Sequence, residues 1–214
     1  MDDLLSFDLL PAREPTLDVT EVANYEAALR HGIARLDDHP LCNRILRETH
    51  GVLLQTGRGS DKSPGELRRT QNWIGPGGCT RNTATFVPPP PQVMSVSMGA
   101  LERFVHETNL PALITAGLAH AQFETIHQFL DGNGRTGRLF ISLLLHQRQT
   151  LTKPVLYLSA FLTRHQAEYF NRLGAVRETG DWEAGSPSFL QEWQSRQSVL
   201  RRLQKQFCRY TGRP

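Results

Sequence analysis

Apolar residues recur at helical spacing along most of the chain and divide it into a series of predicted helices. The first begins at Asp18 or Thr20, either of which can cap it, and its apolar positions are Val22, Tyr25, Leu29, Ile33 and Leu36. The second covers Leu41–Leu54 and turns inward Leu41, Ile45, Leu46 and Leu53. Both patterns are one-sided, which is typical of helices that pack against a core.

Residues 56–91 break this helical pattern. Thr56–Gly65 is polar and rich in glycine, and two short β-prone runs follow it, Gln71–Ile74 and Ala84–Val87. The turn residues between these runs, Gly75-Pro-Gly-Gly78, predict a small β-hairpin. Pro88–Pro91 then stiffen the exit as a polyproline spacer.

The helices predicted after the prolines are more apolar. An amphipathic helix is indicated by the spacing of Val93, Met94, Met98, Leu101, Phe104 and Val105. Pro111–Ile126 is apolar on nearly every side, with Pro111 in the first helical position, and Leu139–Leu145 repeats that composition. Helices of this kind belong in the centre of a bundle. Ser159–Glu178 and a last segment, Ser188–Phe207, are also predicted to be helical.

A polar loop connects the two most apolar helices. It consists of His127-Gln-Phe-Leu-Asp-Gly-Asn-Gly-Arg-Thr-Gly-Arg138, and its middle, Asp131–Gly134, is a strong turn signal. If Gly132 or Asn133 begins the next helix, the first amides of that helix lack partners inside it and lie at the positive end of its dipole. Such a helix start binds phosphate, so this loop is the candidate site.

The side chains of the loop suit a polyphosphate. Arg135 and Arg138 lie on one face of the following helix, and Asp131 is a natural ligand for Mg²⁺ bound to phosphates. Asn133 can donate to a phosphate oxygen, and His127 can accept a proton from an attacking hydroxyl. Together they predict transfer from a Mg-nucleotide to a hydroxyl.

Each of these residues taken alone also has a purely structural interpretation. Phe129 is expected to anchor the loop in the core. A calcium loop is disfavoured because the required ligand spacing and terminal Glu are absent. His120, two helical turns before His127, is expected to pack in the core, because helical zinc sites use a four-residue spacing.

The composition of the chain excludes several classes of protein but points to no further functional site. The chain has 214 residues, 39% of them hydrophobic, and a net charge of +3, which fits one domain and permits anionic ligands. Cys42, Cys79 and Cys208 form neither a disulfide framework nor a metal pattern. The acidic N-terminus does not resemble a signal peptide, and no apolar run reaches the ~18 residues of a membrane span. We therefore expect a cytoplasmic protein that does not enter a membrane.

The last predicted helix is basic. Residues 185–214 contain no acid after Glu192, but they carry Arg196, Arg201, Arg202, Lys205, Arg209 and Arg213. A solvated helix face is the simpler interpretation, and contact with nucleic acid or an acidic partner is the alternative.

The loop resembles the signature of the Fic (filamentation induced by cAMP) family, H-x-F-x-[D/E]-G-N-G-R-x-x-R. Every signature position matches: His127, Phe129, Asp131, Gly132, Asn133, Gly134, Arg135 and Arg138. The likeness to bacterial Fic enzymes of the larger, helix-rich type extends over residues 18–184. It includes Gly65–Arg68, Gln71–Ile74, Phe86–Pro91, Ala119–Ile126 and Leu156–Ser159.

The resemblance implies a mainly α fold, in which a central helix–loop–helix lies in a bundle of about seven to eight helices with a small β-hairpin flap. Residues 1–17 would be a lead-in that remains from the N-terminal region of the family. Residues 18–184 would form the Fic core, and residues 185–214 the C-terminal basic helix.

The resemblance also implies an activity, protein adenylyltransferase (AMPylation). AMP would pass from Mg-ATP to a Ser, Thr or Tyr hydroxyl of a target protein, with release of pyrophosphate. His127 would be the base and Asp131 the Mg²⁺ ligand. The nucleotide would be bound by the anion hole and its neighbours, which are Phe129, Gly132, Asn133, Gly134, Arg135 and Arg138.

Two further regions receive roles from the resemblance. The flap near Ile74 and Val87 would align the target's backbone by strand addition. The helix over Ser159–Glu178 would help to form the adenine pocket, with Tyr169 as a stacking residue. Many relatives carry Arg-Asn where this chain has Arg164-His165, so His165 replaces an asparagine that can contact the nucleotide.

Regulation is a second point of departure. Relatives of this type carry an upstream inhibitory helix with a Ser/Thr-x-x-x-Glu pattern, whose Glu pairs with the arginine corresponding to Arg138. Met1-Asp-Asp-Leu-Leu resembles the stretch that follows that helix, so we expect the chain to lack intramolecular inhibition. The enzyme would then be constitutively active or be restrained by a separate antitoxin-like protein, and the resemblance also allows a homodimer.

Two alternatives stand beside AMP transfer. Other Fic enzymes transfer UMP, phosphocholine or a terminal phosphate, although the phosphate-transferring branch alters the Gly-Asn-Gly-Arg core that is intact here at Gly132–Arg135. The chain could instead be a catalytically weak, nucleotide-binding or DNA-associated remnant that uses its basic tail as the contact.

Overall fold

The computed structural model describes residues 19–150 and 165–179, which belong to two compact units divided between Phe161 and Leu162. In the first unit the described α helices are α1 (Val19–Leu36), α2 (Asn43–Leu53), α3 (Pro91–Glu107), α4 (Ala112–Ile126) and α5 (Asn133–Gln147). In the second unit the described element is α7 (Gln166–Thr179). The mainly α fold is confirmed, and none of the described helices is long and apolar enough to cross a bilayer.

Several predicted segments lie outside the described residues. They are the lead-in at residues 1–17, the beginning of the helix predicted over Ser159–Glu178, and the basic tail at residues 185–214. The predicted domain boundaries at residues 17 and 184 lie there too, so the division into domains stays a prediction.

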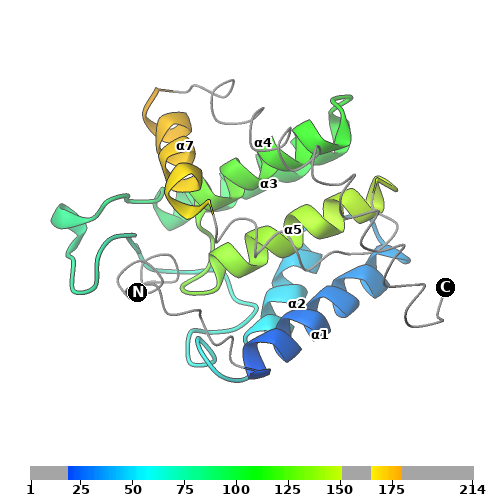
Figure 1. Cartoon of the computed structure of the whole chain (residues 1–214), viewed down its shortest axis with the longest axis horizontal. Helices are drawn as coiled ribbons and strands as arrows, with labels where there is room; N and C mark the ends of the chain where they lie inside the picture. Colours follow the sequence, from blue (N-terminus) through cyan, green and yellow to red (C-terminus); the bar gives the residue numbers. More distant parts are fainter. Residues whose placement is uncertain (1–18, 151–164, 180–214) are drawn as a thin grey trace. The chain divides into compact units, whose positions relative to one another are not determined.

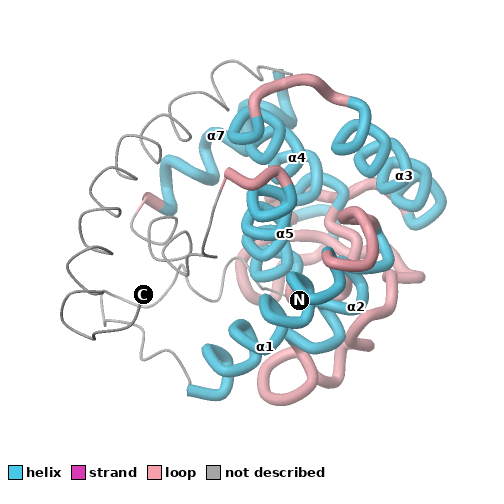
Figure 2. Tube along the Cα trace, turned by 90° about the vertical axis from the view of Figure 1, so that its right-hand side faces the viewer, coloured by secondary structure: helices cyan, strands magenta, loops and turns pink. Residues whose placement is uncertain are grey.

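Helix α5 lies at the centre of the first unit (Figures 1 and 2). It packs against α1, α2 and α4, while α3 packs against α4 and α2. The side chains of Leu139, Leu143, Leu144 and Leu145 are all 0% exposed. The prediction that this apolar segment lies in the middle of a bundle is therefore confirmed.

The inner face of α1 differs from the predicted one. Val22, placed there by its spacing, is 38% exposed, whereas Asn24 is only 5% exposed. Asn24 is buried because its Nδ2 atom donates to Thr56 O at 2.9 Å, which ties α1 to the loop after α2. The buried stripe of α1 then continues through Ala28 and Leu29. In α3, Val93 is likewise exposed, while Met94, Met98, Leu101 and Val105 form the buried face.

Two prolines take up positions that spacing alone did not predict. Pro111 is the N-cap of α4, in an extended conformation with φ −51° and ψ 140°, and not its first helical residue. Pro91 begins α3, so the polyproline spacer covers only Pro88–Pro90. Proline suits a helix start because it lacks only an amide that would have no intrahelical partner there.

A projecting arm, residues 70–90, stands where the hairpin was predicted (Figure 1). Its pairing is one antiparallel bridge, in which Ile74 N donates to Phe86 O at 2.8 Å and Phe86 N donates to Ile74 O at 3.0 Å. The short 3-10 helix η1 (Arg81–Thr83) lies in the connection. The pairing stays short because Pro88–Pro90 have no amides with which to continue a ladder.

Candidate functional site

Helix α4 ends at His127, which adopts the left-handed conformation with φ 51° and ψ 62°. Its N–H still donates to Phe123 O at 2.9 Å, and its side chain is 6% exposed. A non-glycine residue in this conformation costs about 1 kcal/mol or more and is retained only where its surroundings hold it. The residue predicted to be the base is thus the point at which the chain leaves the helix and turns.

Asn133 closes the loop from within. Its Oδ1 atom accepts the N–H of Phe129 at 2.9 Å, and its Nδ2 atom donates to Phe129 O at 2.9 Å. Both residues are 0% exposed, which confirms Phe129 as the anchor of the loop in the core. The Asn133 amide therefore has a structural role, and its contact with a phosphate stays a prediction.

His50 of α2 supports the same loop and was missed by the sequence interpretation. Its ring stacks on Phe129 with centroids 3.7 Å apart and planes 3° apart. Its Nδ1 atom accepts the N–H of Gly65 at 2.8 Å, so the ring proton lies on Nε2, which donates to Asp131 O at 3.0 Å. Burial lowers the pKa of His50 from 6.5 to about 4, so the ring is neutral at neutral pH.

Gly132 starts the helix that carries the arginines. It is the N-cap of α5 with φ 78°, and a Cβ there would lie 3.0 Å from Leu54 Cδ1 and 3.2 Å from His50 Nε2. The first intrahelical bond is from Thr136 N to Gly132 O at 2.9 Å. The amides of Asn133 and Gly134 precede that bond, so they lie at the positive end of the helix, as an anion site requires.

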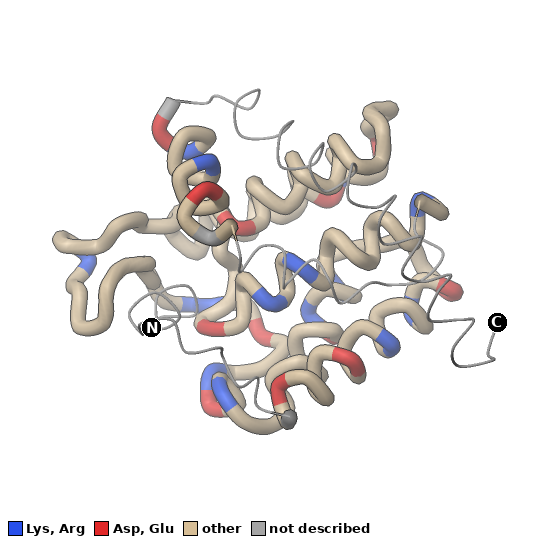
Figure 3. Tube along the Cα trace, viewed as in Figure 1, with Lys and Arg blue, Asp and Glu red and all other residues tan. Residues whose placement is uncertain are grey.

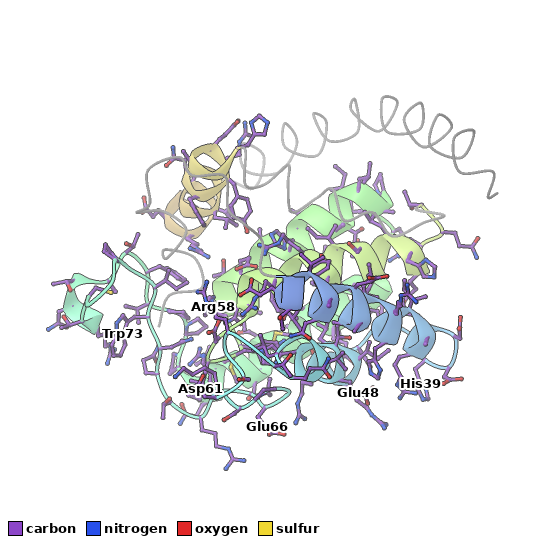
Figure 4. The ribbon with its side chains drawn as sticks, turned by 60° about the horizontal axis from the view of Figure 1, so that its bottom comes forward. His39, Glu48, Arg58, Asp61, Glu66 and Trp73 are labelled. Carbon is purple, nitrogen blue, oxygen red and sulfur yellow. The ribbon has the colours of Figure 1, made fainter. Side chains whose placement is uncertain are left out.

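Charged groups of both signs surround this helix start (Figure 3). Arg135 Nη2 lies 3.6 Å from Asp131 Oδ1, and Arg135 Nη1 lies 3.9 Å from Glu21 Oε1 of α1. Arg135 Nη2 also donates to Arg58 O at 3.4 Å. Arg58 belongs to the loop after α2, which Figure 4 shows near the start of α5. Arg138 is half-buried one turn further along α5. Glu21 and Arg58 were not predicted, because neither belongs to a motif.

Asp131 fits a magnesium ion better than it fits a closed metal site. It is 8% exposed, and its Oδ1 atom accepts the N–H of Gly132 at 2.5 Å. Within residues 19–150 and 165–179, no three His, Cys, Asp or Glu side chains gather closely enough to hold a metal. One carboxylate beside a phosphate-binding helix start is the protein contribution that Mg²⁺ commonly takes, with phosphate oxygens and waters as its other ligands.

The remaining predicted residues lie apart from this loop or cannot be placed against it. His120 packs against α5, with its Nδ1 atom 3.2 Å from Gly137 O, as expected of a core histidine. Ile74 lies in the bridge of the arm, and Val87 follows that bridge. His165 and Tyr169 belong to the second unit, so the contact of His165 with the nucleotide and the stacking of Tyr169 on the adenine stay predictions.

The free energy of unfolding should fall as the pH drops from about 6.5 to about 4, partly because of His50. In that window the unfolded chain, with an ordinary histidine pKa, binds more protons than the folded protein, whose His50 pKa is about 4. The loss from this group is at most about 3 kcal/mol. Urea unfolding between pH 4 and 7, in the presence of a chelator, should show a shallower pH dependence for His50→Gln than for the wild type. An equal pH dependence of the free energy of unfolding in both proteins would contradict the lowered pKa of His50.

Asn133→Ala should lower the free energy of unfolding by about 1–3 kcal/mol, because the buried Phe129 N–H loses its acceptor, while Phe129 O keeps the hydrogen bond from Asn72 Nδ2 at 3.2 Å. Gln128 offers a matched control in the same loop. Its side chain is 1% exposed, and its amide atoms make no hydrogen bond to the described residues. Gln128→Met should therefore be neutral or stabilising by up to about 1 kcal/mol. Urea denaturation checks both values, and the reverse order would refute the assigned contacts.

Comparison with known proteins agrees with this geometry. The sequence model of the Fic/DOC family matches residues 40–145. A protein of Drosophila yakuba named "Protein adenylyltransferase Fic" is 38% identical over 84 residues, which are 38% of this chain and 15% of that protein. The likeness is therefore not limited to bacterial Fic enzymes, although the matched segment covers only a small part of the Drosophila protein.

Solved structures share the fold. A Fic family protein from Desulfovibrio desulfuricans G20 superposes with a TM-score of 0.63 at 26% identity, over 80% of this chain and 48% of that one. A Fic domain containing signaling protein from Bacteroides thetaiotaomicron superposes with a TM-score of 0.61 at 20% identity, over 82% of this chain and 66% of that one. The second likeness concerns the fold alone.

Proposed function

The chain carries the core of a Fic/DOC family domain in residues 40–145, and from this premise we propose that it is a protein adenylyltransferase. It would transfer AMP from Mg-ATP to a Ser, Thr or Tyr hydroxyl of a target protein. One observation carries the proposal. The turn between α4 and α5 holds His127 at the end of one helix and the glycine-rich start Gly132–Arg135 at the beginning of the other. The name of the Drosophila yakuba relative points to the same reaction.

The start of α5 would bind the phosphates of ATP. The amides of Asn133 and Gly134 and the dipole of a 15-residue helix favour negative charge at this end. Arg135 would contact an outer phosphate, and its present neighbours, Glu21 and Asp131, hold its guanidinium at the helix start before nucleotide arrives. Arg138, one turn along the same face, would contact another outer phosphate.

The carboxylate of Asp131 would hold Mg²⁺. The bound ion would neutralise negative charge on the phosphate oxygens. The hydrogen bond from Gly132 N to Asp131 Oδ1 orients this carboxylate, and His50 fixes the Asp131 main chain through its carbonyl. The carboxylate therefore needs little rearrangement to act as a ligand.

His127 would be the general base. Its imidazole accepts the proton of the target hydroxyl, whose oxygen forms a bond to the α-phosphorus of ATP. The bond from that phosphorus to the bridging oxygen breaks, and pyrophosphate leaves. The arm that carries Ile74 and Val87 would align the target's backbone by strand addition. Tyr169 would stack on the adenine, and His165 would stand where many relatives have an asparagine that contacts the nucleotide.

Two labelled forms of ATP test this proposal directly. The protein is incubated with Mg²⁺, a bacterial or insect lysate, and ATP labelled at either the α- or the γ-phosphate. We expect the α-label, and not the γ-label, to become covalently attached to protein. Transfer of the γ-label would show phosphoryl transfer. ATP binding without any labelling would favour a nucleotide-binding remnant.

A further inference from the structure

Arg68 is an almost fully buried cation outside the predicted site. It is 2% exposed and lies between Gly65 and the arm. Its partners among the described residues are main-chain carbonyls. Nε donates to His127 O at 2.8 Å, Nη1 to Thr70 O at 3.2 Å, and Nη2 to Ile126 O at 3.4 Å and to Pro89 O.

These carbonyls belong to two different parts of the molecule. Ile126 and His127 form the C-terminal end of α4, where the base leaves the helix. Thr70 and Pro89 are on the two legs of the projecting arm, one before and one after the bridge of Ile74 with Phe86. One guanidinium therefore joins the main chain of His127 to both legs of the arm. The main chain of Arg68 adds a further link, because its N–H donates to Gln128 O at 3.0 Å.

A rigid fork and a permanent charge both suit this position. The carbonyls at a helix C-terminus carry partial negative charge, which favours a cation. Arginine presents five N–H donors in a fixed plane, so it can reach separate carbonyls at once, whereas lysine offers a single point of charge. Burial lowers the pKa of Arg68, but an arginine stays protonated in proteins. Since a buried cation is costly, only a set of good acceptors explains its retention.

We propose that Arg68 is a positioning residue that fixes the place of the arm relative to His127. A target backbone paired with the arm would then present its hydroxyl at a set distance from the imidazole. The catalytic part of this inference rests on the proposed transfer to protein, whereas the mechanical link between arm and His127 does not. Arg68 itself is 2% exposed, so we assign it no contact with nucleotide or target.

Arg68→Lys in the full chain tests the role, with Arg69→Lys, at the exposed neighbouring arginine, as the matched control. We expect the rate of protein labelling at saturating ATP to fall about 100-fold, since a displacement of 1 Å at a reacting group can have that effect. The dissociation constant of ATP should change less than about threefold, because the phosphate-binding helix start is untouched. If Arg68 served stability alone, its replacement would not lower the labelling rate while leaving ATP binding nearly unchanged. Arg69→Lys should match the wild type in both.

Hydrogen exchange supplies a readout that does not depend on activity. In the wild type, the amides of Ile74, Phe86 and His127 should open together, with the same response to low denaturant. In Arg68→Lys, the Ile74 and Phe86 amides should exchange at least about tenfold faster than in the wild type. Independent opening of the arm and His127 in the wild type would overturn the proposal, even if the variant did not fold.

Three further results would also overturn it: wild-type labelling by a folded Arg68→Lys, equal losses of labelling and ATP binding, or unchanged exchange in the arm of the variant. If the wild type labels no protein at all, the proposed function fails. The exchange comparison then still decides whether Arg68 links the arm to His127.

Discussion

His127→Ala should lower the rate of AMP transfer to protein by about 10²–10⁴-fold, the usual contribution of a general base. Binding of ATP should be nearly unchanged, because the phosphates would be bound by the start of α5, and His127 lies at the end of α4. The rate is measured as incorporation of α-labelled ATP into protein, and ATP binding is measured in parallel. The two measurements together separate a lost base from a lost nucleotide site.

The backbone of residue 127 calls for a second variant. Alanine is strained in the left-handed conformation with φ 51°, whereas asparagine adopts it more readily. His127→Asn should therefore lose as much transfer activity as His127→Ala, but its free energy of unfolding should be closer to that of the wild type. His106→Ala, at an exposed histidine of α3, should leave transfer intact. Substantial transfer by His127→Asn would show that the imidazole is not the base.

Asp131→Asn should reduce transfer by about 10²–10³-fold at a fixed Mg²⁺ concentration, because charge stabilisation by a bound divalent ion is worth several kcal/mol. The amide keeps the size of the side chain and an oxygen that can accept the N–H of Gly132, but it loses the charge that attracts the ion. Titration of the labelling rate with Mg²⁺ should therefore show activity returning only at higher concentrations.

Asp61→Asn is the control for a general loss of negative charge. Asp61 lies on the loop after α2 (Figure 4), is exposed, and pairs with Lys62 at 2.6 Å. Its Mg²⁺ titration should coincide with that of the wild type. If Asp131→Asn titrates as the wild type does, the carboxylate of Asp131 is not the ligand, and the proposed place of the ion is wrong.

The sequence predicted most helices and the place of the loop. Helical spacing located α2 and α3 to within a few residues, because each buries one regular stripe of apolar side chains. The continuous apolar run at Leu139–Leu145 located α5, which is buried on nearly every side. Asp131–Gly134 marked the turn, since few residues other than glycine suit φ 78° at position 132. One error, at Asn24 and Val22, occurred where a polar contact, and not hydrophobicity, decides burial.

The supports of the loop could not be predicted in this way. Arg68 and His50 bind main-chain carbonyls of residues 126, 127 and 131, and any amino acid presents such a carbonyl. The partner residues therefore leave no trace in the local pattern. The structural role of the Asn133 side chain was missed for a related reason. Its amide could serve a phosphate or the Phe129 backbone, and only the fold shows that the second contact exists.

By itself, the sequence determined a mainly helical chain with a helix–loop–helix that carries His127, Asp131 and Arg135, because periodicity and turn chemistry are local properties. Only the tertiary structure decided which groups hold that loop in place. Arg68 is 59 residues away from His127, and His50 is 81 residues away from Asp131. Contacts over such separations depend on how the helices pack, so the groups that aim the candidate base and metal ligand appear only once the chain is folded.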